Sequence, residues 1–237
     1  VIIEHSILNF KRYIMPIKRP KSLRELALEY LRKSIIDGTL KMGQILSERK
    51  ISEELGVSKS PVREALAQLR DEGLINIEPQ KGARVFSLSD DEVSQICDFR
   101  LAIEMAAFEL ALLRNNKALS EDMAQIVKRM ITERSRGNEK AYLELDTTFH
   151  QIIFEHAGND YLTASCTRFI GKIAALRTHL SKLPKHTDLS FEEHQDISIA
   201  VLKGDLSQIK SLLVKHIDRT RSAYKNASIV HEVMSTH

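Results

Sequence analysis

The sequence predicts a mainly α-helical protein, with a small N-terminal domain of three helices and two strands followed by an all-α antiparallel bundle of about six helices. Apolar residues recur at spacings of three and four over most of the chain, which is the period of helices that bury one face. Apolar and polar residues alternate only near residues 75–86, on either side of a turn, and this pattern favours two strands. Gly, Asn and Pro residues divide the remainder into helical segments.

Composition limits the kinds of protein that the chain can be. No stretch approaches the roughly 18 apolar residues of a membrane span, and the first ten residues lack the cleavage site of a secretion signal. We therefore expect a cytoplasmic protein with no membrane contact. The two cysteines, Cys97 and Cys166, do not have the spacing of a disulfide framework or a thiolate metal site.

Charge is distributed unevenly along the chain. Residues 1–88 contain 16 Lys and Arg against 11 Asp and Glu, whereas the remainder contains 19 against 21. A basic N-terminal part suits phosphate binding, although chance gives such unevenness about as often.

The N-terminal part is divided into an arm and a domain. Residues 1–21 have no clean period and are expected to form a flexible basic arm. Residues 22–88 contain three predicted helices, each ending at a glycine, and then the two strands around a turn at 79–82. Two short helices joined by a tight glycine turn and followed by a β-ribbon constitute a winged helix-turn-helix, which binds DNA. The helices are expected to begin near Ser22, Ser47 and either Ser58 or Ser60, and to end near Gly38, Gly56 and Gly73.

The third predicted helix carries residues that suit a DNA-reading helix. Such a helix lies across the major groove with its N-terminal residues nearest the base edges. Arg63 can make a bidentate contact to guanine, and Lys59 and Ser60 can reach phosphates or bases. The alternative for Arg63, and for Lys81 at the wing tip, is an ordinary solvated surface cation. The predicted DNA-binding residues are Arg49, Ser58, Lys59, Ser60, Pro61, Arg63, Lys81 and Gly82.

Residues 89–237 form the second predicted domain. Ser89 followed by three acidic residues is a strong helix start, and every later segment has helical spacing. Short connections favour antiparallel packing of these helices. The predicted helices are 90–114, 119–136, 138–156, 159–182, 188–203 and 205–226, with breaks at Asn115–Asn116, Gly137, Gly158, Pro184 and Gly204.

Polar residues fall on the apolar faces of three bundle helices. Asp146 and His150 share one stripe, and His194 and His216 lie on similar stripes in the last two helices. Burying these four side chains is costly unless they satisfy one another. A divalent cation bound by the carboxylate and three imidazoles would satisfy them and keep positions open for a small molecule. Three ordinary core histidines paired with backbone groups are the alternative.

Several motifs resemble the GntR family of bacterial regulators. In the first domain these are LSER at 46–49, LGVSKSPVREAL at 55–66 and LRDEGL at 69–74, with lysine at position 59 where the family often has arginine. The second domain resembles the FCD domain of the FadR-type branch in RLAIE at 100–104, DTTFH at 146–150, NDYL at 159–162, His194 and His216. Six helices rather than seven suggest the VanR-like subgroup.

The resemblance implies a metal and an effector in the second domain. FCD domains bind a divalent metal through an Asp and three His, so the implied ligands of a Zn, Ni, Mn or Fe ion are Asp146, His150, His194 and His216. Many members bind a small carboxylate at that metal, so a small organic or sugar acid is the implied effector.

Two arginines are candidates for effector binding. Arg100 can clamp a carboxylate or, equally, form a structural salt bridge with Glu104 one turn later, and Arg177 is a second candidate. His156, His179 and His186 lie near predicted helix ends and are expected at the surface.

The sequence thus predicts a homodimeric transcription regulator, most simply a repressor, that binds double-stranded DNA at a near-palindromic operator. A metal-dependent enzyme is the competing function, although no Glu or His is clearly offered as a general base and no HExxH motif occurs. A purely structural metal is the third alternative.

Overall fold

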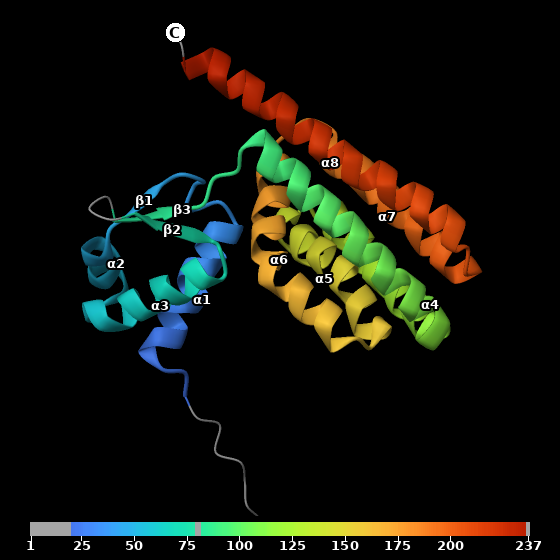
Figure 1. The fold of residues 1–237 in the computed structure, drawn as a ribbon, viewed down its shortest axis with the longest axis horizontal. Coiled ribbons are helices and arrows are strands. Elements are labelled where there is room, and N and C mark those ends of the chain that lie inside the picture. The colour runs from blue at the N-terminus through green and yellow to red at the C-terminus, as the bar shows by residue number, and fades with distance from the viewer. Residues whose placement is uncertain (1–19, 79–81, 236–237) are drawn as a thin grey trace, which may run out of the picture.

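The structure is a computed structural model and describes residues 20–78 and 82–235. Figure 1 shows two lobes, a small one built from the N-terminal elements and a larger one built only from helices. We call α1 to β3 the head and α4 to α8 the bundle. This arrangement confirms the predicted fold class. The predicted arm, residues 1–21, lies outside the described residues except for Pro20 and Lys21.

The head contains α1 (Leu23–Ile36), α2 (Glu48–Leu55) and α3 (Lys59–Asp71), with strands β1 (Ile45–Leu46), β2 (Ile75–Glu78) and β3 (Gly82–Val85). A capping box starts α1, because the Ser22 hydroxyl accepts from the Glu25 N–H and the Glu25 carboxylate accepts from the Ser22 N–H. The apolar faces of α1 and α3 pack on the sheet around Leu31, Leu69 and Val85, all fully buried.

The sheet has one strand more than the sequence predicted. Strand order is β1-β3-β2, and both pairings are antiparallel. β2 and β3 pair in the register Ile75 with Val85 and Ile77 with Ala83, which makes the predicted ribbon. β1 has only two residues, too few to show alternation in the sequence, and it pairs with the outer edge of β3.

The bundle contains α4 (Asp90–Ser135), α5 (Glu139–Ala157), α6 (Asp160–Leu180), α7 (His186–Lys203) and α8 (Leu206–Ser235). The N-terminal part of α4, green in Figure 1, runs antiparallel beside α8. In the part of the chain that the structure describes, no helix is long and apolar enough to cross a bilayer.

α4 consists of two helical segments, as the sequence predicts, which meet at a kink. Its backbone leaves helical geometry at Asn115, with φ −145° and ψ 36°. The Asn115 side chain donates to the carbonyl of His156, and Arg114 donates to the carbonyls of Ala157 and Gly158, so the kink caps the end of α5. Counted as two segments, α4 brings the bundle to the predicted six helices.

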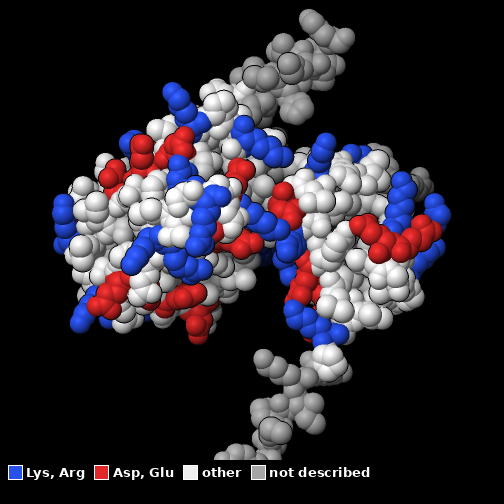
Figure 2. Space-filling model, turned by 180° about the vertical axis from the view of Figure 1, so that it is seen from behind, with Lys and Arg blue, Asp and Glu red and all other residues white. Residues whose placement is uncertain are grey.

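The head is seated on α6, the bundle helix nearest to it in Figure 1. Ala175 of α6 is part of the head's hydrophobic core, and Gly171 of α6 faces the Leu74 side chain. Beside this contact two clefts, each of about 780 Å³, separate α1 from α5 and α6. Figure 2 shows the hollow between the lobes, with charged side chains of both signs on its walls.

Candidate nucleic-acid interface and candidate metal centre

The turn between α2 and α3 exposes the N-terminus of α3. Gly56 ends α2 in a left-handed conformation, φ 64°, and Ser58 occupies the N-cap position of α3. The Ser58 hydroxyl is exposed and makes no capping hydrogen bond. The first-turn N–H groups of α3 therefore have no side-chain cap, and such groups bind phosphate readily.

Arg63 is exposed on α3 and held by a carboxylate of α2. Its Nη2 lies 3.0 Å from Oε2 of Glu48, while 68% of the Arg63 side chain remains exposed. Arg49, next to Glu48, pairs with Glu53 at 3.1 Å. Surface ion pairs of this kind are weak, so a DNA phosphate or base can replace these carboxylates. Of the other predicted residues, Lys59 and Ser60 are exposed and Pro61 is half-buried in the first turn of α3.

The predicted wing residues are placed only in part. Gly82 begins β3 with φ +86°, and no atom of the described residues lies within 4 Å of where a Cβ would be. Its left-handed backbone, rather than crowding, therefore favours glycine. Lys81 lies outside the described residues.

Three histidines from three bundle helices meet in the core. His150 of α5, His194 of α7 and His216 of α8 are 4%, 0% and 2% exposed. One nitrogen from each lies within 4.8 Å of the others, and the Nε2 atoms of His150 and His194 are 3.2 Å apart. This separates the predicted site from the alternative of isolated core histidines, because these imidazoles face one another rather than backbone groups.

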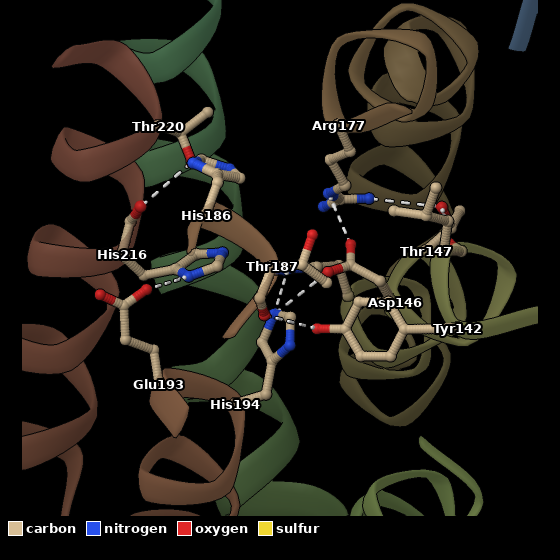
Figure 3. Close-up of polar contacts among 12 residues, drawn as sticks. Tyr142, Asp146, Thr147, Arg177, His186, Thr187, Glu193, His194, His216 and Thr220 are labelled. Carbon is tan, nitrogen blue, oxygen red and sulfur yellow. Dashed lines mark hydrogen bonds and ion pairs between the residues drawn. The ribbon is translucent and has the colours of Figure 1, made fainter. Parts of the chain in front are cut away.

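The orientation of two imidazoles is fixed by glutamates. Nδ1 of His150 lies 2.9 Å from Glu104 Oε2, and Nδ1 of His216 lies 2.8 Å from Glu193 Oε2, as Figure 3 shows for the second pair. Ionised carboxylates only accept hydrogen bonds, so each Nδ1 carries the proton. The Nε2 lone pairs therefore face the centre, which is the arrangement that metal-binding histidines adopt.

The predicted fourth ligand, Asp146, lies beside the triad. Its Oδ1 is 3.6 Å from Nε2 of His194, and its Oδ2 forms an ion pair of 2.8 Å with Nε of Arg177. Oδ2 is buried and has no hydrogen bond of good geometry among the described residues. Figure 3 shows Arg177 reaching from α6 to Asp146 on α5. The two predicted residues are therefore direct neighbours.

Arg100 forms the salt bridge that was one of its two predicted roles, and it keeps a nitrogen that could serve the other role, carboxylate binding. Its Nε donates to Glu104 Oε1 at 2.9 Å, which is the predicted salt bridge. The side chain is 2% exposed, yet its Nη2 has no partner among the described residues. A buried guanidinium nitrogen without a partner is costly, and an anion would satisfy it.

Electrostatics keep the carboxylates charged and the imidazoles neutral. Burial raises the pKa of Glu193, but His216 and Arg219 outweigh it and lower that pKa to about 2. Burial lowers the pKa of His150 to about 4 against the opposing effect of Glu104, and burial also lowers the pKa of His194 and His216. Neutral imidazole is the form that binds a metal ion.

The expectation that His156, His179 and His186 lie at the surface is wrong, since all three are half-buried. His186 lines a cavity of about 20 Å³ together with Tyr142, Asp146, Arg177 and His216. It accepts a hydrogen bond of 2.9 Å from Nη1 of Arg219. His186 lies at the start of α7, before the apolar stripe of that helix, so its spacing in the sequence did not indicate that it lines a cavity.

Glu193 and Arg219 also belong to the site, although the sequence pattern did not predict them. Glu193 is 3% exposed and binds Arg219 through both of its oxygens. A signal was present, because Glu193 lies four residues before the buried Ile197 and so on the inner face of α7. The inward nitrogens and the buried Asp146 carboxylate beside them together fit a divalent cation with N and O ligands.

Two family matches cover most of the chain. Residues 23–85 match the bacterial regulatory proteins of the gntR family, and residues 95–219 match the FCD domain. Among solved structures, McbR/YncC of Escherichia coli has the same fold, with a TM-score of 0.74, 18% identity, and coverage of 88% of this chain and 100% of that one.

Curated proteins with similar sequences include transcriptional repressors. The gluconate operon transcriptional repressor of Bacillus licheniformis is 35% identical over 56% of this chain and 54% of its own length, so the match spans about half of that relative. The repressor NanR of Klebsiella aerogenes is 29% identical over 89% of this chain and 88% of its own. With its FCD match alone spanning more than half of the sequence, the chain belongs to the GntR family of bacterial regulatory proteins and carries an FCD domain.

Proposed function

We propose that this protein is a sequence-specific transcription regulator whose DNA affinity is controlled by a small organic or sugar acid bound at a divalent metal in the bundle. Residues 22–88 are the DNA-binding domain in this proposal, and residues 89–237 bind the effector and form the homodimer. The observation that carries the proposal is the buried centre itself, where one nitrogen from each of three imidazoles lies within 4.8 Å of the others and Asp146 lies beside His194.

The head supplies the DNA contacts. The uncapped N-terminus of α3 binds a phosphate, Arg63 contacts guanine, and Lys59, Ser60 and Arg49 support it on the same face. A two-fold homodimer presents two such helices, so its operator is a near-palindrome. Repression is the simplest mode of regulation, and the named relatives carry the word repressor in their names.

The bundle supplies the effector site. Asp146, His150, His194 and His216 hold the cation, which is Zn, Ni, Mn or Fe and which supplies a Lewis acid for a carboxylate oxygen. Arg177 of α6 contacts Asp146, and Arg100 of α4 has a buried nitrogen without a hydrogen-bond partner among the described residues, so we assign these two guanidinium groups to the other carboxylate oxygen.

Helix α6 connects this site to the head. Arg177 of α6 contacts Asp146, while Gly171 and Ala175 of the same helix support the head. An acid that draws Arg177 away from Asp146 shifts α6, and the seat of the head shifts with it. The effector thereby changes the population of heads that are placed for binding DNA.

The test is a melting-temperature screen of small organic and sugar acids, run with and without chelator, followed by DNA binding to a duplex selected from a random pool. The proposal expects chelator to lower the melting temperature, and one acid to raise it only when metal is present. That acid should also change DNA affinity. If the metal raises the melting temperature but no acid does, the metal has a purely structural role. If selection yields no duplex that the protein prefers to random DNA, the DNA-binding role is overturned.

A further inference from the structure

Two histidines of the triad are each the buried end of an Arg–Glu–His chain. In the first, Arg100 donates to Glu104 Oε1 at 2.9 Å and His150 donates to Glu104 Oε2 at 2.9 Å. In the second, Arg219 donates to Glu193 Oε1 at 3.0 Å and His216 donates to Oε2 at 2.8 Å. The chains arise from different helices and converge on one centre.

The third histidine lacks such a chain. His194 is fully buried, and its Nδ1 has no hydrogen-bond partner among the described residues. Its Nε2 faces Nε2 of His150 and Oδ1 of Asp146. Nothing on the Nδ1 side therefore fixes which nitrogen of His194 carries the proton.

We propose that Glu104 and Glu193 are the positioning residues of the metal centre. They hold His150 and His216 in the Nδ1–H form with Nε2 directed inward, and so set the affinity for metal, while His194 is the adjustable ligand. This inference rests on the proposed function, because it presupposes that the triad binds a metal ion.

The chemistry of a carboxylate is needed at both positions. Each glutamate accepts from a guanidinium and from an imidazole N–H. Glu104 uses one oxygen for each donor, whereas Glu193 accepts from Arg219 through both oxygens and from His216 through Oε2. Glutamine has the same size but only one acceptor oxygen, and its NH₂ group would face a donor. Glu104→Gln and Glu193→Gln each break one bond of the chain and release the imidazole from its fixed orientation.

The experiment measures Zn²⁺ affinity of the full chain by competition with a chromophoric chelator. We expect each glutamine variant to bind Zn²⁺ roughly 10- to 100-fold more weakly than wild type. Glu109→Gln is the matched control, because Glu109 lies on the same helix as Glu104 and is exposed. Co²⁺ absorption spectra provide a second readout, and we expect the ligand-field bands to change in both variants and not in the control.

The outcomes distinguish this inference from the function on which it rests. If wild type binds neither Zn²⁺ nor Co²⁺, the metal-dependent function fails. If wild type binds Zn²⁺ and both glutamine variants bind it equally well with unchanged Co²⁺ spectra, only the positioning role is overturned.

If a glutamine variant does not fold, the inference can still be tested on the wild-type protein alone. Imidazole ¹⁵N NMR of metal-free wild type should show His150 and His216 protonated at Nδ1. Protonation at Nε2 in either residue would contradict the inference without any substitution.

Discussion

The Arg63 guanidinium is positioned by one carboxylate, and that carboxylate is easily replaced. Both partners, Arg63 and Glu48, lie at the surface of the head. For Arg63→Ala we expect about 5- to 150-fold weaker binding to the selected operator, because a bidentate contact to guanine is lost. Fluorescence anisotropy at fixed salt measures the affinity for the operator. Arg70→Ala is the matched control on the same helix, where Arg70 pairs with Asp71, and equal losses in both variants would remove Arg63 from base reading.

His186 gives the protein a dependence on pH. Burial and the nearby Arg219 lower its pKa in the folded protein to about 4, against about 6.5 when unfolded. As pH falls below about 6.5, the unfolded chain binds a proton that the folded protein does not bind until about pH 4. His186 therefore stabilises the fold above this window, and its contribution is lost as pH falls.

The His186→Asn variant tests this sign. Asparagine keeps an acceptor for Arg219 but has no titrating group. We expect urea unfolding of the variant, with chelator present in both proteins, to depend less on pH between 6.5 and 4 than that of wild type. Parallel pH profiles would show that His186 is not neutral in the folded protein.

Single residues were predictable where helical phase carried the information. Asp146, His150, His194 and His216 were found because their spacing puts them on apolar stripes, and the structure brings all four together. The pairing of Glu193 with Arg219 was not predicted, because the two residues come from different helices. Sequence periodicity describes only one helix at a time. Arg100 can form a salt bridge with Glu104 or bind a carboxylate. The choice depends on its Nη2, which has no partner among the described residues, and a sequence does not show which side-chain atoms lack partners.

Among the elements, α6 has the tightest contact with the head. A Cβ at Gly171 would lie 3.1 Å from Cδ1 of Leu74. We expect Gly171→Leu to overpack this contact and lower the free energy of unfolding by about 1–3 kcal/mol. Ser165→Leu, at an exposed position of the same helix, is the control. Urea unfolding measures both variants, and an equally stable Gly171→Leu protein would show that the head does not rest on α6.

Helices were more predictable than strands. The bundle helices followed from periods that span many residues, whereas β1 has two residues and is formed only by backbone pairing with β3. The break that the sequence predicts at Asn115–Asn116 coincides with the non-helical backbone of Asn115, where the two helical segments of α4 meet at a kink.

At the scale of the whole molecule, one exposed ion pair crosses the cleft between head and bundle. Lys140 of α5 lies 3.6 Å from Asp37, just after α1, with 53% and 28% of the two side chains exposed. An exposed pair contributes less than about 1 kcal/mol. We therefore expect Lys140→Ala to leave stability unchanged within that limit. Lys140→Glu places like charges across the cleft and should enlarge the radius of gyration in small-angle scattering at low salt.

Salt separates charge from packing in that experiment. About 0.5 M salt screens the repulsion between residue 140 and Asp37, so the radius of gyration of Lys140→Glu should return toward that of wild type. An increase that persists in salt would mean that the substitution disturbs packing rather than electrostatics.

The cavity beside the candidate metal centre is about 20 Å³, room for one water molecule. The acid effector that we propose is larger, so it would bind only conformers in which the connection from α6 to α7 has moved outward. That connection includes Lys185, whose backbone is strained at φ 60°. The apparent dissociation constant for an acid equals its intrinsic value divided by the fraction of open molecules. Substitutions at Lys185 can therefore change the concentration at which the protein responds without altering any group that touches the acid.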